Sequence, residues 1–401
     1  MSGTEAAALG IDADLERRML EIRRHLHRHP ELSNAERETQ AYLDAVLRAA
    51  GLTEVRPVAG FGLAVDIVGT AGPSNRKVAI RADIDALPIE EMSGVSFASE
   101  RPGVMHACGH DAHAAMGYAT AVLLDRARES FSGTVRIIFQ PAEEAEPLGG
   151  ARVVAEGLLD DIDAAIGIHV DPYTETGRIA VGPGPYTLAC DIFDIVVSGS
   201  STHAAKPFEG VDTIVTAAAI VTGLQKIVAR ETDPFDPLVV SVTAITGGTA
   251  YNILPAEVRL KGTIRSGQPE TRDRARRRLV QIAEGIAAAH GATAAVGITP
   301  GEPPVLNDPA MVDLIRASAA RVLGPENAVS APGWTASDDF AFYSEKRPAV
   351  YFRLGIRSEA AGSVWPLHHP QFRVDEAALP KGAAVLSDAA RAFLRAPGDG
   401  A

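Results

Sequence analysis

Residues 105–113 read MHACGHDAH and place one of only two cysteines among three histidines and an aspartate. Thiolate, imidazole and carboxylate groups together are the ligand set of zinc, manganese, cobalt or nickel rather than of calcium. Gly109 lets the backbone turn so that Cys108 and His110 can face one point. A helical pattern starts near Asp111, and a helix N-terminus is expected to lower the pKa of Cys108 and favour its thiolate. The stretch therefore predicts a metal site.

Further candidate ligands follow predicted strands of an α/β sheet, whose carboxyl ends are where ligands gather. Asp83 ends VAIRAD, the pair Glu143 and Glu144 follows TVRIIFQ, and His169 closes AAIGIH. Each alone is an ordinary strand-end or loop residue, but they agree with the cysteine-containing stretch. The sequence WPLHHPQF adds His368 and His369.

A third group of histidines, at positions 25, 27 and 29, lies in LERRMLEIRRHLHRHPEL, an amphipathic pattern that stops at Pro30. Spacing by two scatters side chains around a helix. We therefore interpret these histidines as solvated residues at a helix end rather than as a metal cluster.

The elements that must position the candidate ligands alternate between β-rich and helical patterns. Strands are predicted over 77–85, 133–141 and 163–170, with helices at AHAAMGYATAVLLDRA and GGARVVAEGLL. Such alternation indicates an α/β domain with a central, largely parallel or mixed sheet.

The pattern changes near residue 187. Residues 187–301 predict an inserted α+β sandwich, and residues 1–186 with 302–401 form a discontinuous α/β domain that carries the candidate metal ligands.

Composition limits the class of protein. The 401 residues are 46% hydrophobic, carry a formal net charge of -13 and include two cysteines. The charge argues against nucleic acid or an anionic membrane as a partner, and two cysteines are too few for a disulfide framework. We find no signal-peptide pattern and no apolar run of about 20 residues that could span a membrane, so we expect a cytoplasmic protein.

At this point a family resemblance is clear over nearly the whole chain. The chain resembles the aminoacylase/carboxypeptidase family of dinuclear metal amidohydrolases, in the branch of hippurate hydrolases, N-acyl-amino-acid amidohydrolases and indoleacetyl-amino-acid hydrolases. The Cys-Gly-His-Asp and Pro-Ala-Glu-Glu motifs are the branch-specific features. In chain order the similar segments are RRHLHRHPELS, RADIDALP, MHACGHDAH, FQPAEE, GIHV, STHAAKP, TAYNILP, GTIRS, SDDFAFY and PLHHPQF.

The resemblance implies two divalent metal ions per subunit, most simply zinc or manganese, with cobalt or nickel as alternatives. It implies five metal ligands, and Cys108 stands where other branches use a bridging aspartate; if the choice between the two C-terminal histidines is wrong, His369 binds instead. The implied ligands are Cys108, His110, Glu144, His169 and His368.

By the same resemblance Glu143 is the general base. Adjacent side chains on extended backbone point in opposite directions, so one acid can bind metal while its neighbour reaches water. An unperturbed carboxylate that deprotonates free water faces about 15 kcal/mol, and a metal that brings the water to a pKa near ~7 reduces this to about 4 kcal/mol. Asp83 and Asp111 are expected to orient ligand histidines, and His106 and His113 are expected to be structural.

The resemblance implies that residues 187–301 are a lid and dimerisation domain and that residues 1–186 with 302–401 are the catalytic, metal-binding domain. Three residues of the inserted domain match substrate-contacting positions of the family. His203 matches a histidine that crosses a homodimer interface and polarises the scissile carbonyl of the partner's substrate. Asn252 and Arg265 match positions that hold the substrate's carbonyl and carboxylate. Thr202 and Phe208 depart from the usual pattern and leave the shape of the substrate pocket open.

The resulting functional hypothesis is hydrolysis of N-acyl amino acids, by hydroxide generated at the metals, to a carboxylic acid and a free amino acid. A dipeptidase or carboxypeptidase on the same site is the alternative. Two other classes explain less of the sequence. A cysteine-nucleophile hydrolase using Cys108 with His110 or His113 gives the glutamate pair no role, and the complete ligand set disfavours a non-catalytic binding protein.

Overall fold

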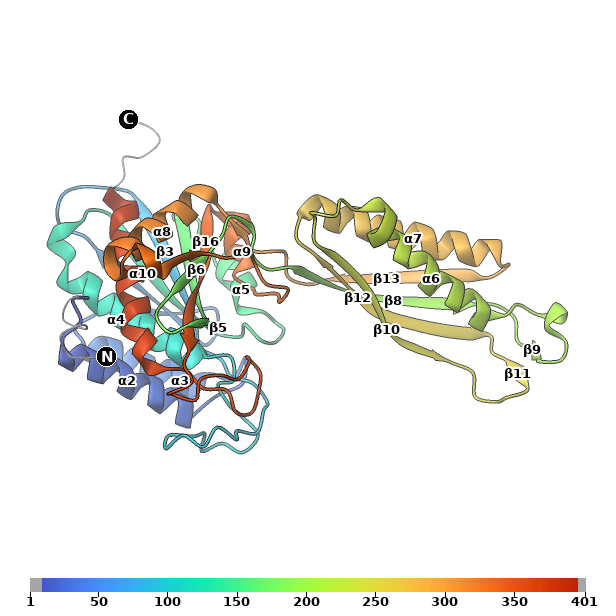
Figure 1. The fold of residues 1–401 in the computed structure, drawn as a ribbon, viewed down its shortest axis with the longest axis horizontal. Coiled ribbons are helices and arrows are strands. Elements are labelled where there is room, and N and C mark those ends of the chain that lie inside the picture. Colours follow the sequence, from blue (N-terminus) through green and yellow to red (C-terminus); the bar gives the residue numbers. More distant parts are fainter. Residues whose placement is uncertain (1–8, 396–401) are drawn as a thin grey trace. The chain divides into compact units, whose positions relative to one another are not determined.

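The computed structural model describes residues 9–395, which form two compact units (Figure 1). Unit 1 comprises residues up to Gly184 together with Leu306–Gly333 and the residues from Asp339 onward; unit 2 comprises Pro185–Val305 and Trp334–Asp338. The boundaries predicted from the sequence were 186/187 and 301/302. Residues 1–8, which carry part of the signal-peptide argument, lie outside the described residues.

Unit 1 is built on an eight-stranded mixed sheet, and the predicted α/β class is confirmed. Parallel pairing joins β4 to β3, β3 to β5, β5 to β16 and β6 to β15, while the other pairs are antiparallel. The strand order is β1 (Val55–Val58), β2 (Gly62–Val68), β4 (Thr134–Gln140), β3 (Lys77–Asp83), β5 (Ala164–Glu175), β16 (Ala349–Arg357), β6 (Ile179–Val181) and β15 (Ala328–Ser330).

Helices cover the sheet and share its hydrophobic core. The inward residues of β3, such as Ile80, belong to one core cluster with side chains of α2, α4, α8 and α10. On the other face of β3, Arg81 reaches Asp339, whose carboxylate accepts a hydrogen bond from Gly150 in α5. The helices are α2 (Ala13–Arg28), α3 (Arg37–Ala49), α4 (His110–Arg126), α5 (Gly149–Ala155), α8 (Pro309–Leu323), α9 (Ala341–Lys346) and α10 (Leu379–Arg395).

The parallel strands β3 and β4 end side by side, and β3 pairs in parallel with β5 up to Gly167, two residues before His169. Asp83 pairs in register with Gln140, directly before the segment that carries Glu143 and Glu144. His169 does not close its strand as predicted, because β5 continues to Glu175 and His169 pairs in register with Arg353 of β16.

Unit 2 is a four-stranded antiparallel sheet with two helices, α6 (Thr213–Glu231) and α7 (Pro269–Ala289), that share its core. A short pair, β9 (Thr202–His203) with β11 (Ile253–Leu254), lies outside this sheet. The chain enters and leaves the unit near β7 (Gly184–Pro185) and β14 (Leu306–Asn307). The sheet order is β10 (Leu238–Gly247), β12 (Glu257–Ser266), β8 (Ala189–Ser198) and β13 (Thr293–Pro300).

Helix α6 corrects one statement from the sequence, because its length and composition alone would allow it to cross a membrane. The sequence argument counted only unbroken apolar runs. In the structure Ala217, Ile220, Leu224 and Ile227 form a stripe at helical spacing that is buried in the core of unit 2. A helix that packs one apolar face onto a sheet is a common element of a folded domain core.

Candidate metal centre

Cys108 and His110 flank the start of α4, and Gly109 between them has φ +87°. A Cβ atom at position 109 would lie 2.5 Å from Cγ2 of Val170. Both the backbone conformation and the space therefore require glycine. This turn lies against Val170 of β5, and it places the thiol of Cys108 3.4 Å from Nε2 of His169.

The five predicted ligands are brought together by the structure. Ligand atoms of Cys108, His110 and His169 lie within 4.8 Å of one another, and so do those of Cys108, Glu144 and His368. Cys108 belongs to both groups, as a bridging ligand would. His110, Glu143 and Glu144 form a further group of the same size.

His110 presents one nitrogen to this cluster. Its Nδ1–H donates to Oδ1 of Asp85 at 3.0 Å, and Nε2 has no hydrogen-bond partner among residues 9–395 although it is buried. Burial alone would lower the pKa of His110, but Asp83 and Asp85 raise it to about 10. Carboxylates that favour a positive charge on this ring would equally favour a metal cation at Nε2.

His169 has the same arrangement. Its Nδ1–H donates to the carbonyl oxygen of Val170 at 2.7 Å, and its Nε2 lies 3.4 Å from Sγ of Cys108. Burial holds the pKa of His169 well below its ordinary value. The ring is therefore neutral, which is the form that binds metal.

The expected lowering of the Cys108 pKa is wrong. Burial, and then the charges of Glu144 and Glu143, raise the pKa of this thiol well above its ordinary value. The helix N-terminus contributes about 1 kcal/mol at most at a typical site, which these effects exceed. Burial and the two glutamates therefore disfavour the thiolate of Cys108 in the metal-free protein, which counts against the cysteine-nucleophile hypothesis.

The two C-terminal histidines are separated by their contacts. Nε2 of His368 lies 3.2 Å from Oε1 of Glu144, and the backbone of His368 is in the left-handed region at φ +62°. The ring of His369 instead stacks on Trp365 with centroids 4.4 Å apart. The geometry favours His368 over His369 as the candidate ligand.

The aspartates assigned to orient ligands have different partners. Asp111 bonds His27 and Arg23 of α2, and among residues 9–395 its carboxylate forms no hydrogen bond or ion pair with the five candidate ligands. The carboxylate of Asp83 is bonded to Nδ1 of His113 and lies 3.7 Å from Nε2 of His110. Burial alone would raise the pKa of Asp83, but the charge of Arg81 holds this pKa well below its ordinary value. The orienting aspartate of His110 is Asp85, which the sequence reasoning missed.

Three histidines outside the predicted ligand set, His113, His106 and His27, are buried near the candidate site or in α2. His113 is held at both nitrogens, by Asp83 and by the backbone N–H of Val170, as expected for a structural residue. His106 is buried with no hydrogen-bond partner for either nitrogen among the described residues, and burial lowers its pKa to about 4. The interpretation of His27 as solvated is wrong, because it is buried and bonds Asp111 and Glu91.

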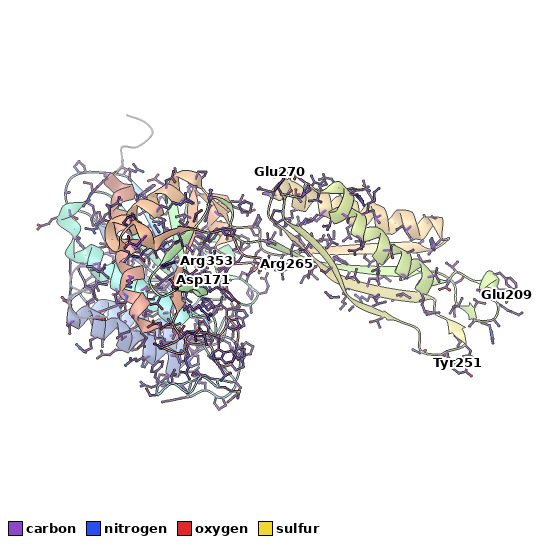
Figure 2. All side chains as sticks on the ribbon, viewed as in Figure 1. Asp171, Glu209, Tyr251, Arg265, Glu270 and Arg353 are labelled. Atoms are coloured by element: carbon purple, nitrogen blue, oxygen red, sulfur yellow. The ribbon has the colours of Figure 1, made fainter. Side chains whose placement is uncertain are left out.

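The predicted residues of unit 2 fall at its two ends. Strand pairing sets His203 opposite Ile253, and Ala204 N–H donates to the carbonyl of Asn252. Arg265 lies near the far end of β12, where it donates to Oγ of Ser337. Figure 2 shows Arg265 and Tyr251, the neighbour of Asn252, at opposite ends of the unit.

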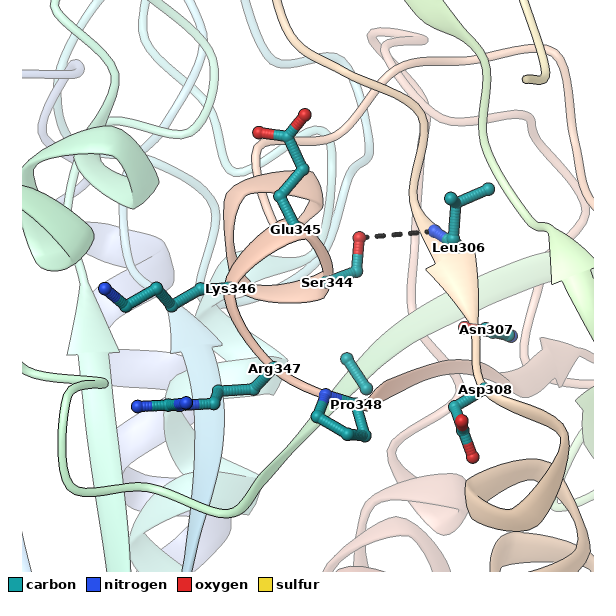
Figure 3. Close-up of a pocket in the computed structure, with 9 residues that line it drawn as sticks. Leu306, Asn307, Asp308, Ser344, Glu345, Lys346, Arg347 and Pro348 are labelled. Carbon is teal, nitrogen blue, oxygen red and sulfur yellow. Dashed lines mark hydrogen bonds between the residues drawn. The ribbon is translucent and has the colours of Figure 1, made fainter. Parts of the chain in front are cut away.

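A pocket of about 360 Å³ lies at the amino end of β16, away from the carboxyl ends where the candidate ligands gather (Figure 3). Two of its polar side chains are bonded within the protein: Oγ of Ser344 accepts from Leu306 N–H, and Lys346 pairs with Asp160. It contains none of the predicted site residues.

Comparison with known proteins decides the family. Residues 79–392 match the model of Peptidase family M20/M25/M40. This chain belongs to the M20 peptidase family. It is similar to N-acetyl-L-cysteine deacetylase of Bacillus subtilis, at 39% identity over 95% of this chain and 89% of that protein. It is also similar to thermostable carboxypeptidase 2 of Saccharolobus solfataricus, at 38% identity over 92% of this chain and 94% of that protein.

The solved structures agree. A dinuclear metal binding peptidase of the M20 family from Bacillus subtilis superposes with a TM-score of 0.84 at 35% identity, covering 96% of this chain and 99% of that one. This M20 protein is therefore a dinuclear metal hydrolase of the amidohydrolase branch that acts on amide bonds. The cluster around Cys108 fits such a centre by donor type and by the unpartnered Nε2 of His110.

Proposed function

We propose that this M20 enzyme hydrolyses N-acyl amino acids to a carboxylic acid and a free amino acid. The observation that carries the proposal is the shared position of Cys108 in two groups of candidate ligands, with Glu143 in a third group beside them. Similarity to a named N-acetyl-L-cysteine deacetylase supports this substrate class.

The metal ligands in this proposal are Cys108, His110, Glu144, His169 and His368, with two zinc or manganese ions per subunit. When bound, the ions supply Lewis acidity that polarises the scissile carbonyl and acidifies the attacking water. Glu143 would accept one proton from the attacking water as the C–O bond forms, and would then deliver this proton to the nitrogen of the leaving amine as the C–N bond breaks. The products are a carboxylate and an amino acid.

His203 and Asn252 complete the site from the inserted domain, and we propose that they do so across a homodimer. Along β12 the distance from Glu257 to Arg265 is about 26 Å at about 3.3 Å per residue. One small substrate is too short to meet Arg265 and the β9–β11 end of the same subunit. The proposal therefore gives Arg265 and the pair of His203 and Asn252 to two different substrate molecules: Arg265 binds an amino-acid carboxylate, and His203 with Asn252 serves the substrate of the partner subunit.

The surface around His203 supports this arrangement. Phe208 is 81% exposed and Tyr251 is 99% exposed, and Ile253 of β11 is half exposed. Exposed aromatic and aliphatic side chains grouped together mark protein interaction sites. Sedimentation of the purified enzyme tests the dimer, and a dimer formed by a His203→Ala variant without turnover supports the shared site.

A peptidase acting on dipeptides or C-terminal residues is the second candidate, because the carboxypeptidase relative is nearly as similar as the deacetylase. Release of free amino acid from matched N-acetyl amino acids and dipeptides separates the two. Higher kcat/KM on dipeptides would replace the proposed substrate class while leaving the metal centre unchanged.

We also propose a cytoplasmic location. Cys108 and Cys190 are free cysteines, and Cys108 must stay reduced to bind metal. Fractionation of cells that make the enzyme tests this, and activity confined to an exported fraction would contradict it.

A further inference from the structure

The segment between β4 and α5 carries Glu143 and Glu144 on a strained backbone. Ala142 directly precedes them and has φ +50°, in the left-handed region. A residue with a Cβ atom costs about 1–2 kcal/mol in this conformation. Something in the surroundings must hold Ala142 there.

A buried carboxyl group from a distant part of the chain does so. Oε1 of Glu36, the residue before α3, accepts a hydrogen bond from Ala142 N–H at 2.7 Å. The carbonyl of Ala142 accepts from Gly149 N–H at 2.8 Å, so both peptide groups of Ala142 are fixed. Glu36 is fully buried, and burial raises its pKa to about 7.

A second buried carboxylate holds the next part of the same segment. Oδ2 of Asp85 accepts from Glu144 N–H at 3.0 Å and from Oγ of Ser33 at 2.7 Å. Ser33 and Glu36 belong to one short stretch before α3, so this stretch contacts the Glu143–Glu144 segment twice, once directly and once through Asp85. Burying a carboxyl group is costly, and Oε2 of Glu36 has no hydrogen-bond partner among the described residues.

We infer that Glu36 is a positioning residue, whose carboxyl group holds Ala142 in the left-handed conformation and thereby aims Glu143 and Glu144 at the reaction centre. The inference rests on the roles proposed for Glu143 and Glu144. The hydrogen bond from Ala142 N–H to Glu36 is made to the backbone of this segment. Its effect passes through the backbone.

Two substitutions of Glu36 distinguish the length of its side chain from its charge. In Glu36→Gln the amide oxygen still accepts from Ala142 N–H, and the charge is lost. In Glu36→Asp the carboxyl group is kept but is one methylene too short. We expect Glu36→Asp to lower the affinity for Mn²⁺ alone, measured by calorimetry on chelated protein, by tenfold or more and to lower kcat more than it raises KM, while Glu36→Gln stays within about threefold of the wild type.

Two further variants test the backbone route. Glycine adopts positive φ without strain, so Ala142→Gly should restore at least part of the Mn²⁺ affinity lost in Glu36→Asp. Glu31 is the matched control, because it is buried in the same region and accepts from Thr39 N–H at 2.8 Å without touching the Glu143–Glu144 segment. Glu31→Gln should keep the Mn²⁺ affinity even if its thermal stability falls.

The inference is overturned if Glu36→Asp binds Mn²⁺ and turns over like the wild type, or if Glu36→Gln has the larger defect. It is also overturned if Glu31→Gln loses as much Mn²⁺ affinity as Glu36→Asp. Glu144→Ala serves as the reference: if that variant keeps both metals, the proposed ligand assignment fails. If it loses metal while Glu36→Asp does not, only the role of Glu36 fails.

Discussion

The Nδ1–H group of His110 donates to Oδ1 of Asp85 at 3.0 Å, which leaves Nε2 of the ring directed at the cluster around Cys108. The other oxygen of Asp85 accepts from the backbone N–H of Glu144. One buried carboxylate thus fixes two candidate ligands from different elements, the start of α4 and the segment after β4. Such outer contacts set both the tautomer and the orientation of a metal-binding histidine.

We predict that Asp85→Asn weakens metal binding by about 10–100-fold. An asparagine side chain has one accepting oxygen, so it cannot accept from both His110 and Glu144 as the carboxylate does. Titration of chelated protein with Mn²⁺ measures the affinity. Wild-type affinity in this variant would contradict the role of Asp85.

Asp111 gives a matched comparison, since it too is a buried aspartate beside the motif. Asp111→Asn should leave Mn²⁺ affinity unchanged and lower the free energy of unfolding by about 3 kcal/mol, because Arg23 and His27 lose their buried counter-charge. Urea unfolding of the chelated protein measures the loss. Weakened metal binding with unchanged stability would return Asp111 to the role expected from the sequence.

Mutation of the two adjacent glutamates, Glu143 and Glu144, should have different effects on metal content and turnover. Glu143→Ala is predicted to keep two metals per subunit and to lose turnover by a factor of about 100 or more, as for removal of a general base. Glu144→Ala is predicted to lose metal. Metal content by elemental analysis and turnover on the same samples decide the assignment, and the reverse pattern would exchange the two roles.

A pH-dependent stability is expected from Glu36 in the metal-free protein. Burial raises its pKa to about 7 from an ordinary 4.5, so the unfolded chain loses this proton first as the pH rises. Below pH 4.5 this group leaves the free energy of unfolding unchanged. Between pH 4.5 and about 7 the free energy of unfolding falls, by up to about 3 kcal/mol in all. Glu36→Gln removes that loss, so its stability relative to the wild type should increase from pH 5 to pH 8. Urea midpoints with chelator present measure this, and a constant difference would contradict the buried-acid account.

The sequence predicted the gathering of the candidate ligands because strand ends and a glycine turn are local features. Asp83, Glu144 and His169 follow or lie in β3, β4 and β5, and the parallel order of these strands brings them together. Cys108 and His110 face the same point because Gly109 allows it. Motif matching supplied His368, which no strand pattern indicated.

The supporting residues could not be predicted in the same way, because their roles depend on contacts across 59–106 residues of sequence. Asp111 was misassigned because consecutive helical residues point about 100° apart, so it faces α2 while His110 faces the cluster. Asp85 had a signal that was overlooked: residues two apart on extended chain share a side, so RADID sets Asp83 and Asp85 together.

We propose that this enzyme hydrolyses the amide bond of N-acyl amino acids when the candidate ligands around Cys108 hold metal. The most direct measurement is release of free amino acid from a panel of N-acetyl, N-benzoyl and long-chain N-acyl amino acids, with dipeptides alongside, using chelated and then metal-reloaded enzyme. We predict turnover of at least one N-acyl amino acid that disappears on chelation and returns with zinc, manganese or cobalt. Turnover that persists after complete removal of metal, or none on any N-acyl amino acid in any metal, would contradict the account.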